Sequence, residues 1–164
     1  MNCIDWAGAK TFCEWIGGRL PTEDEWQYAA THDGTQALQT TYPWGNDAPT
    51  HCGHAIYAGG STNYYCDGRT EAASSVGTSA VGTYSPLLGD SPLGLQDMTG
   101  NVWEFTSSLY DLSCDPANEK CAYVGKGGSW SENSIYLPVA HRSTFHDYFY
   151  PTGWFIDLGF RCAE

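Results

Sequence analysis

Glycine and proline constrain the fold of this chain more than any other residue types do. Its 164 residues include 19 glycines and 8 prolines. Beyond about residue 31 they alternate with Ser, Thr, Asn and Asp, which favour turns over long helices or strands. This pattern predicts short strands joined by long ordered loops. With 41% hydrophobic residues, residues 1–164 are expected to form a single α+β domain.

The first thirty residues predict two helices. After Asp5, a capping residue, apolar residues recur at helical spacing through Ile16, and glycines follow. Thr22 and Glu25 have the spacing of a capping box, which predicts a second helix running to about Thr31.

The charge of the chain excludes several partners. Nineteen acidic and seven basic side chains leave a formal net charge of −12, which repels phosphate backbones and anionic membrane surfaces. Nucleic acid is therefore not expected as a partner. No run reaches the roughly 20 apolar residues of a membrane helix, so no membrane insertion is expected. The first residues lack the plan of a signal peptide, which predicts that any targeting segment lies upstream or has been lost.

Seven cysteines favour an oxidising, extracytoplasmic compartment, whether periplasmic, secreted or cell-surface. The sequence has neither a Cys-x-x-Cys pair nor histidine-rich spacing, so disulfides are favoured over a structural zinc site. Proximity favours pairing Cys52 with Cys66 and Cys114 with Cys121, because each pair closes a loop containing turn residues. Other pairings stay open on spacing alone.

Four ordered segments, dense in glycine, tryptophan and arginine, carry a family resemblance. They are Gly-Arg-Leu-Pro-Thr-Glu-Asp-Glu-Trp (18–26), Tyr-Pro-Trp-Gly-Asn (42–46), Gly-Leu-Gln-Asp-Met-Thr-Gly-Asn-Val-Trp-Glu-Phe (94–105), and Gly-Gly-Ser-Trp (127–130) with Gly-Phe-Arg-Cys (159–162). The chain resembles the sulfatase-modifying-factor family, whose founding members are the formylglycine-generating enzymes. The resemblance covers nearly the whole chain. It implies a disulfide-bonded, C-type-lectin-like fold with little regular secondary structure, whose amino-terminal family segment is missing here.

The family pattern also implies a disulfide between Cys13 and Cys162, which would tie the first helix to the end of the chain. Cys3 is then left over. It has either lost a partner upstream or is a free thiol.

One calcium site is implied by the resemblance. The matching family stretch supplies the Asp97 side chain, the backbone carbonyls of Gly100 and Val102, and the Glu104 carboxylate. Hard cations prefer several oxygen ligands, which a tight Gly-Asn turn flanked by carboxylates can provide. The alternative interpretation is a capped turn with a solvated glutamate.

Copper is not expected, although formylglycine-generating enzymes bind copper(I) through two cysteines shortly after the Gly-Gly-Ser motif. Soft thiolates suit that ion, and one of them also takes part in the chemistry. Residues 131–142 contain no cysteine. His141 and His146 lie nearby but cannot supply the thiol, so they are interpreted as surface or hydrogen-bonding residues. No catalytic residue is assigned.

The segment after Gly128 is rich in aromatic and small polar residues, a composition typical of adaptable recognition surfaces. The residues expected to bind a ligand are Trp130, Tyr136, His141, Arg142, Phe145, His146 and Tyr148. Core packing is the alternative for the aromatic rings. The leading hypothesis is a non-oxidase family member that binds a peptide, protein or glycan. The alternatives are a formylglycine-generating oxidase and a structural domain of a longer surface protein.

Overall fold

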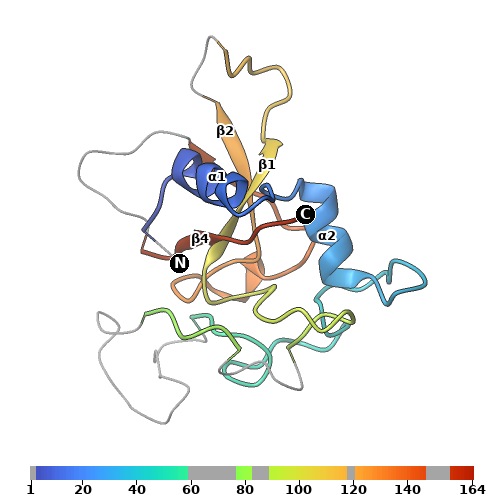
Figure 1. Ribbon diagram of the computed structural model, residues 1–164. Helices are drawn as coiled ribbons and strands as arrows, with labels where there is room; N and C mark the ends of the chain where they lie inside the picture. The colour runs from blue at the N-terminus through green and yellow to red at the C-terminus, as the bar shows by residue number, and fades with distance from the viewer. Residues whose placement is uncertain (1–2, 59–76, 83–88, 118–120, 147–155) are drawn as a thin grey trace.

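The computed structural model describes residues 3–58, 77–82, 89–117, 121–146 and 156–164 (Figure 1). The elements are the helices α1 (Trp6–Trp15) and α2 (Glu23–Thr31), the strands β1 (Trp103–Leu109), β2 (Ala122–Lys126), β3 (Ser143–His146) and β4 (Leu158–Phe160), and the 3-10 helix η2 (Ser134–Tyr136). As the glycine and proline content predicts, loops make up most of the other described residues. Among the described helices, none has the length and apolar character needed to cross a membrane.

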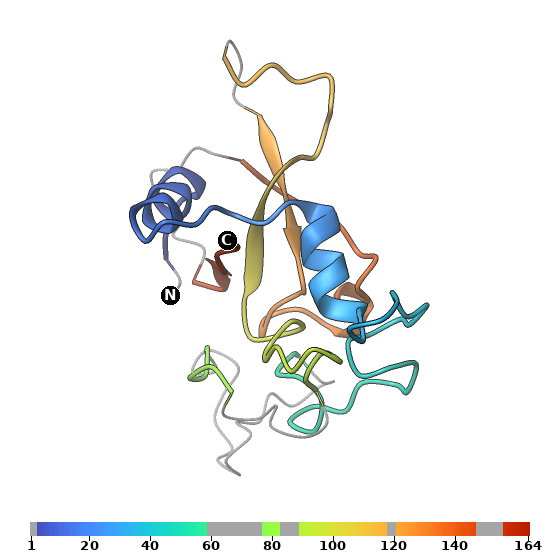
Figure 2. The ribbon, with the colours of Figure 1, turned by 45° about the vertical axis from the view of Figure 1, so that its right-hand side comes forward.

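The strands form one mixed sheet in the order β3-β2-β1-β4, in which β4 runs parallel to β1 and the other pairs are antiparallel. Strands β1 and β2 lie between the two helices (Figure 2). Because successive strand residues point to opposite faces, Trp103 and Phe105 pack with α1, whereas Glu104 faces Trp26 of α2. The two faces of β1 therefore contact different helices, α1 on one side and α2 on the other.

Both helix starts confirm the sequence predictions. The Asp5 carboxylate accepts a hydrogen bond from the Gly8 amide at 2.7 Å, and the reciprocal capping box between Thr22 and Glu25 is complete. The first helix ends at Trp15, one residue before the predicted Ile16, and both of these side chains are exposed. The predicted apolar stripe is therefore only partly buried.

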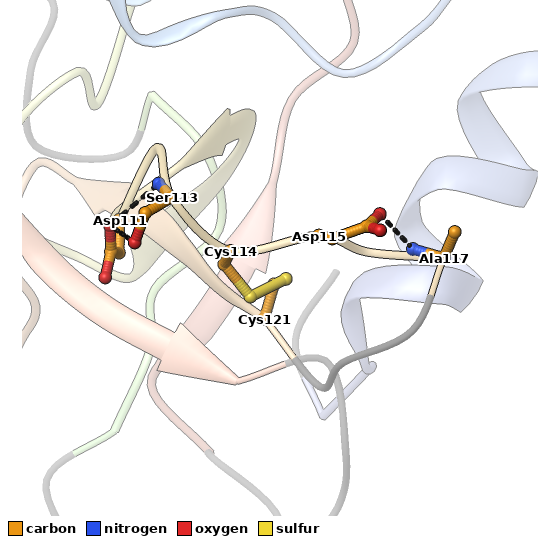
Figure 3. Close-up of a disulfide and its surroundings, with 6 residues drawn as sticks. All are labelled: Asp111, Ser113, Cys114, Asp115, Ala117 and Cys121. Carbon is orange, nitrogen blue, oxygen red and sulfur yellow. Dashed lines mark hydrogen bonds between the residues drawn. A yellow bond between two sulfur atoms is a disulfide. The ribbon is translucent and has the colours of Figure 1, made fainter.

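Two predicted disulfides are confirmed. Cys13 pairs with Cys162 across 149 positions, and Cys114 pairs with Cys121 across 7 positions in the loop between β1 and β2 (Figure 3). Cys3 is a free, half-buried cysteine. The third predicted pairing, Cys52 with Cys66, falls on Cys66, which lies outside the described residues.

Candidate functional site

A buried carboxylate in β1 connects the sheet to α2 and to the end of the chain. Glu104 accepts hydrogen bonds from Trp26 Nε1 at 2.6 Å and from Arg161 Nε and Nη2, each at 2.6 Å. The Glu104 side chain is 7% exposed and the Arg161 side chain 26%. Burial opposes the charge on Arg161, but the facing Glu104 carboxylate outweighs it and raises the pKa of Arg161. Arg161 is thus held in its charged form inside the protein.

Arg161 also fixes the turn that precedes β1. Its Nη2 donates to the carbonyls of Gln96 at 3.1 Å and Asp97 at 3.3 Å. The turn needs left-handed backbone at Gly100, where φ is +78° and an added Cβ would lie 2.4 Å from the Ile56 carbonyl oxygen. Glycine is the residue that tolerates both constraints.

The predicted calcium ligands lie in and beside this turn. Asp97, Val102 and Glu104 line one cavity of about 220 Å³, and Gly100 is buried in the turn itself. Burial raises the pKa of Asp97, while a hydrogen bond from the Gly82 amide to Oδ2 at 2.7 Å opposes the shift.

The available oxygens fit a hard cation. Within the described part of the chain, the carbonyls of Gly100 and Val102 accept no hydrogen bond, and Asp97 Oδ1 has none either. A cation bound there would coordinate these free carbonyls and Asp97 Oδ1, and its charge would add to that of Arg161, which lines the same cavity. The Glu104 carboxylate already pairs with Arg161, so a metal would share it with the guanidinium.

A second polar cluster follows the Gly-Gly pair, in the segment that corresponds to the copper-binding cysteines of the formylglycine-generating enzymes. Ser129 Oγ and Ser131 Oγ donate to Asp157 Oδ2 at 2.7 Å and 2.6 Å. Burial, and then the nearby Asp157 carboxylate, raise the pKa of Glu132. Sequence reasoning assigned none of these four residues to the site, because only the fold brings Asp157 next to a segment that lies 26 positions earlier.

Three ring-bearing residues of the predicted ligand surface pack around Trp103 of β1. Trp103 contacts the rings of Tyr136, His141 and Phe145 at centroid distances of 6.1, 5.9 and 5.7 Å. Phe145 is 8% exposed and belongs to the core cluster that contains Ala9. Of the two interpretations left open for Phe145, the structure shows core packing.

The other predicted ligand residues lie in varied positions. Trp130 is half-buried, and its Nε1 has no hydrogen-bond partner among the described residues. The backbone of His146 ends β3, opposite Ala122. Tyr148 lies outside the described residues.

Arg142 belongs to a charged cluster centred on Glu23. Its Nε donates to the Glu23 carboxylate at 2.9 Å, and its guanidinium lies 5.0 Å from the centre of the Tyr110 ring. Lys126, which is fully buried, lies 3.5 Å from the same carboxylate. Burial lowers the pKa of Lys126 to about 8, although Glu23 opposes the shift.

Lys126 is expected to make stability depend on alkaline pH. Between its folded pKa of about 8 and its ordinary value of 10.5, the unfolded chain binds more protons than the folded one. This group therefore makes the free energy of unfolding rise with pH in that window, by up to about 1.4 kcal/mol per pH unit, and adds no slope below it. Urea unfolding measured from pH 7 to 10.5 should show this rise in the free energy of unfolding for the unmodified chain and its absence in Lys126→Met. Lys10→Met, which removes an exposed lysine, is the control, and equal slopes in both variants would contradict the assignment.

The family model described as "Sulfatase-modifying factor enzyme 1-like domain" matches residues 1–164. The chain belongs to this sulfatase-modifying-factor family. It is 32% identical over 168 residues to the bovine (Bos taurus) inactive C-alpha-formylglycine-generating enzyme 2, covering 98% of this chain and 48% of that protein. It is 40% identical over 121 residues to the formylglycine-generating enzyme of Mycobacterium tuberculosis, covering 72% of this chain and 37% of that protein.

The fold of this sulfatase-modifying-factor domain is C-type-lectin-like, as the resemblance implies. PvdO from Pseudomonas aeruginosa superimposes with a TM-score of 0.64 at 24% identity, over 97% of this chain and 59% of PvdO. The chain spans less than half the length of the two curated relatives above.

Proposed function

We propose that this domain is a non-oxidase member of its family that binds a peptide, protein or glycan with the surface following Gly128. One observation carries the proposal: residues 131–142 contain no cysteine. A serine–carboxylate network of Ser129, Ser131 and Asp157 lies there instead. The similarity to a relative named as inactive supports it.

The alternative, a formylglycine-generating oxidase, is supported by the similarity to enzymes of that name. The test is mass spectrometry of a Cys-x-Pro-x-Arg peptide incubated with the folded chain, copper(I), oxygen and reductant. Circular dichroism first confirms tertiary structure. We expect the cysteine to stay unconverted. Conversion to the aldehyde would overturn the proposal, and Cys3→Ser would then show whether the free thiol supplies the activity.

A structural domain of a longer surface protein is the second candidate. The mutual packing of Trp103, Tyr136 and Phe145 favours it, because these rings offer little free area to a ligand. Panning a displayed library of random peptides on the immobilised chain separates the two functions. Enriched peptides should bind Arg142→Ala more weakly but bind the control Arg19→Ala normally, since Arg19 pairs with Glu25 and is comparably exposed. Absence of enrichment would favour the structural domain.

We also propose that one calcium ion binds at Asp97, Gly100, Val102 and Glu104. Calcium at a hundred times its dissociation constant should then raise the free energy of unfolding by about 2.7 kcal/mol. Thermal unfolding with calcium or with EDTA measures this increment. It should disappear in Asp97→Asn and persist in Asp47→Asn, which alters an exposed carboxylate elsewhere. Identical melting with calcium and with EDTA in the unmodified chain would contradict the site.

An extracytoplasmic location belongs to the same proposal. The disulfides Cys13–Cys162 and Cys114–Cys121 support it, because such bonds persist in oxidising compartments.

A further inference from the structure

A groove outside both sites described above runs between α2, residues 37–41 and residues 138–140. Its volume is about 580 Å³, within the range of small-molecule sites. Its lining combines apolar residues, such as Leu38 and Val139, with uncharged hydrogen-bonding groups. Among the described residues that line it, Asp24 is the single charged side chain, and none is a cation.

Several polar groups in the groove are available to a ligand. Asp24 and Gln39 are exposed, and neither side chain has a hydrogen bond within the described part of the chain. Gln27 donates one amide hydrogen bond to Glu23 at 3.2 Å, which leaves its carbonyl oxygen as an acceptor. Thr40 Oγ1 is buried without a partner among the described residues. A ligand hydroxyl would satisfy this buried group once a change of the Thr40 rotamer brings its oxygen to the groove surface.

An aromatic ring at the groove is held in a fixed orientation. Tyr28 is 52% exposed, and its ring stacks on His32 with centroids 4.0 Å apart and planes at 23°. Tyr28 lies in α2, and His32, one helical turn later, caps the end of that helix. The stack therefore orders the Tyr28 ring before any ligand arrives. The free part of such a ring suits the apolar face of a sugar.

We propose that this α2 groove binds a neutral saccharide unit. Acceptors at Asp24 and Gln27, the amide of Gln39 and the hydroxyl of Thr40 match the many hydroxyls of a pyranose, and Tyr28 matches its apolar face. The formal charge of −12 and the lack of a cation in the lining disfavour phosphorylated or carboxylated ligands. The inference goes beyond the proposed function: residues 138–140 belong to the segment after Gly128, but none of the described residues predicted to bind its ligand lines this groove.

The experiment is saturation-transfer NMR on the intact chain with methyl glycosides of glucose, galactose, mannose and N-acetylglucosamine as probes. At least one should bind, and glucuronic acid and glucose 6-phosphate should not. Tyr28→Ala and Asp24→Ala should each lower the affinity for the bound glycoside about tenfold. A loss of this size is typical of one hydrogen bond to a charged group, or of a comparable contact. Tyr110→Ala and Asp47→Ala are the matched controls at exposed positions outside the groove.

Binding by none of the four glycosides would overturn the proposal, as would equal binding of the anionic sugars. Binding that survives both groove substitutions would place the saccharide elsewhere and overturn it too. Near-ultraviolet circular dichroism of each variant verifies its fold. The outcome is independent of the peptide experiment, which depends on Arg142.

Discussion

Removal of the Cys13–Cys162 disulfide is expected to lower the free energy of unfolding by about 5 kcal/mol in the chain-entropy model. The bond joins positions 149 residues apart, so it restricts the unfolded chain over nearly its whole length. In the folded state the same ends are also held by the reciprocal hydrogen bonds between Arg19 and Ala163, each 2.8 Å. The double variant Cys13→Ala/Cys162→Ala should therefore keep its fold while losing much of a typical domain's 5–15 kcal/mol of stability.

The Cys114–Cys121 disulfide provides the matched control. It closes a loop of only 7 positions, and the same model gives a loss of about 2.5 kcal/mol on its removal. Urea unfolding of both double alanine variants, followed by circular dichroism and fluorescence, measures the difference. Equal losses would show that the two bonds act through the native state rather than through the length of chain they restrict.

Substitution of Arg161 by methionine is expected to destabilise the domain by about 3–5 kcal/mol, because it leaves the buried Glu104 carboxylate without its charged partner. Trp26 would remain as a single hydrogen-bond donor to that carboxylate. The loss of the bonds from Arg161 to the carbonyls of Gln96 and Asp97 would also loosen the turn before β1.

Arg19→Met is the control for this prediction. Arg19 makes two hydrogen bonds of 2.6 Å to Glu25, as Arg161 does to Glu104, but both partners are exposed, at 48% and 43%. Water screens an exposed ion pair, so Arg19→Met should lower the free energy of unfolding much less than Arg161→Met does. Chemical unfolding in EDTA compares the two variants without a contribution from calcium. Similar losses would contradict the importance of burial at Glu104.

Local features of this protein were predictable from sequence because they depend on neighbours a few positions away. The cap at Asp5 and the capping box of Thr22 and Glu25 each involve atoms three residues apart. The short Cys114–Cys121 bridge follows from proximity, whereas the Cys13–Cys162 bridge needed the family pattern. The candidate site was predictable only in part. Its turn was located by the family motif, but the pairing of Glu104 with Arg161 was not predicted.

The aromatic surface shows why composition alone was insufficient. Phe145 and Tyr136 lie in a segment whose mixture of rings and small polar residues suits recognition or core packing equally well. The choice depends on tertiary contacts with Trp103: Phe145 lies on β3, which pairs with β2, and η2 brings Tyr136 to the same ring.

By itself, therefore, the sequence determined the two helices and their caps, the acidic character, the scarcity of long regular elements and the family. Only the tertiary structure decided that the buried Glu104 and Lys126 and the half-buried Asp157 pair with distant residues, and that α2 borders a groove. The physical reason is range. Caps and turns are set by hydrogen bonds within one helical turn, whereas burial and charge pairing arise when the sheet brings together segments separated by 26 to 103 positions.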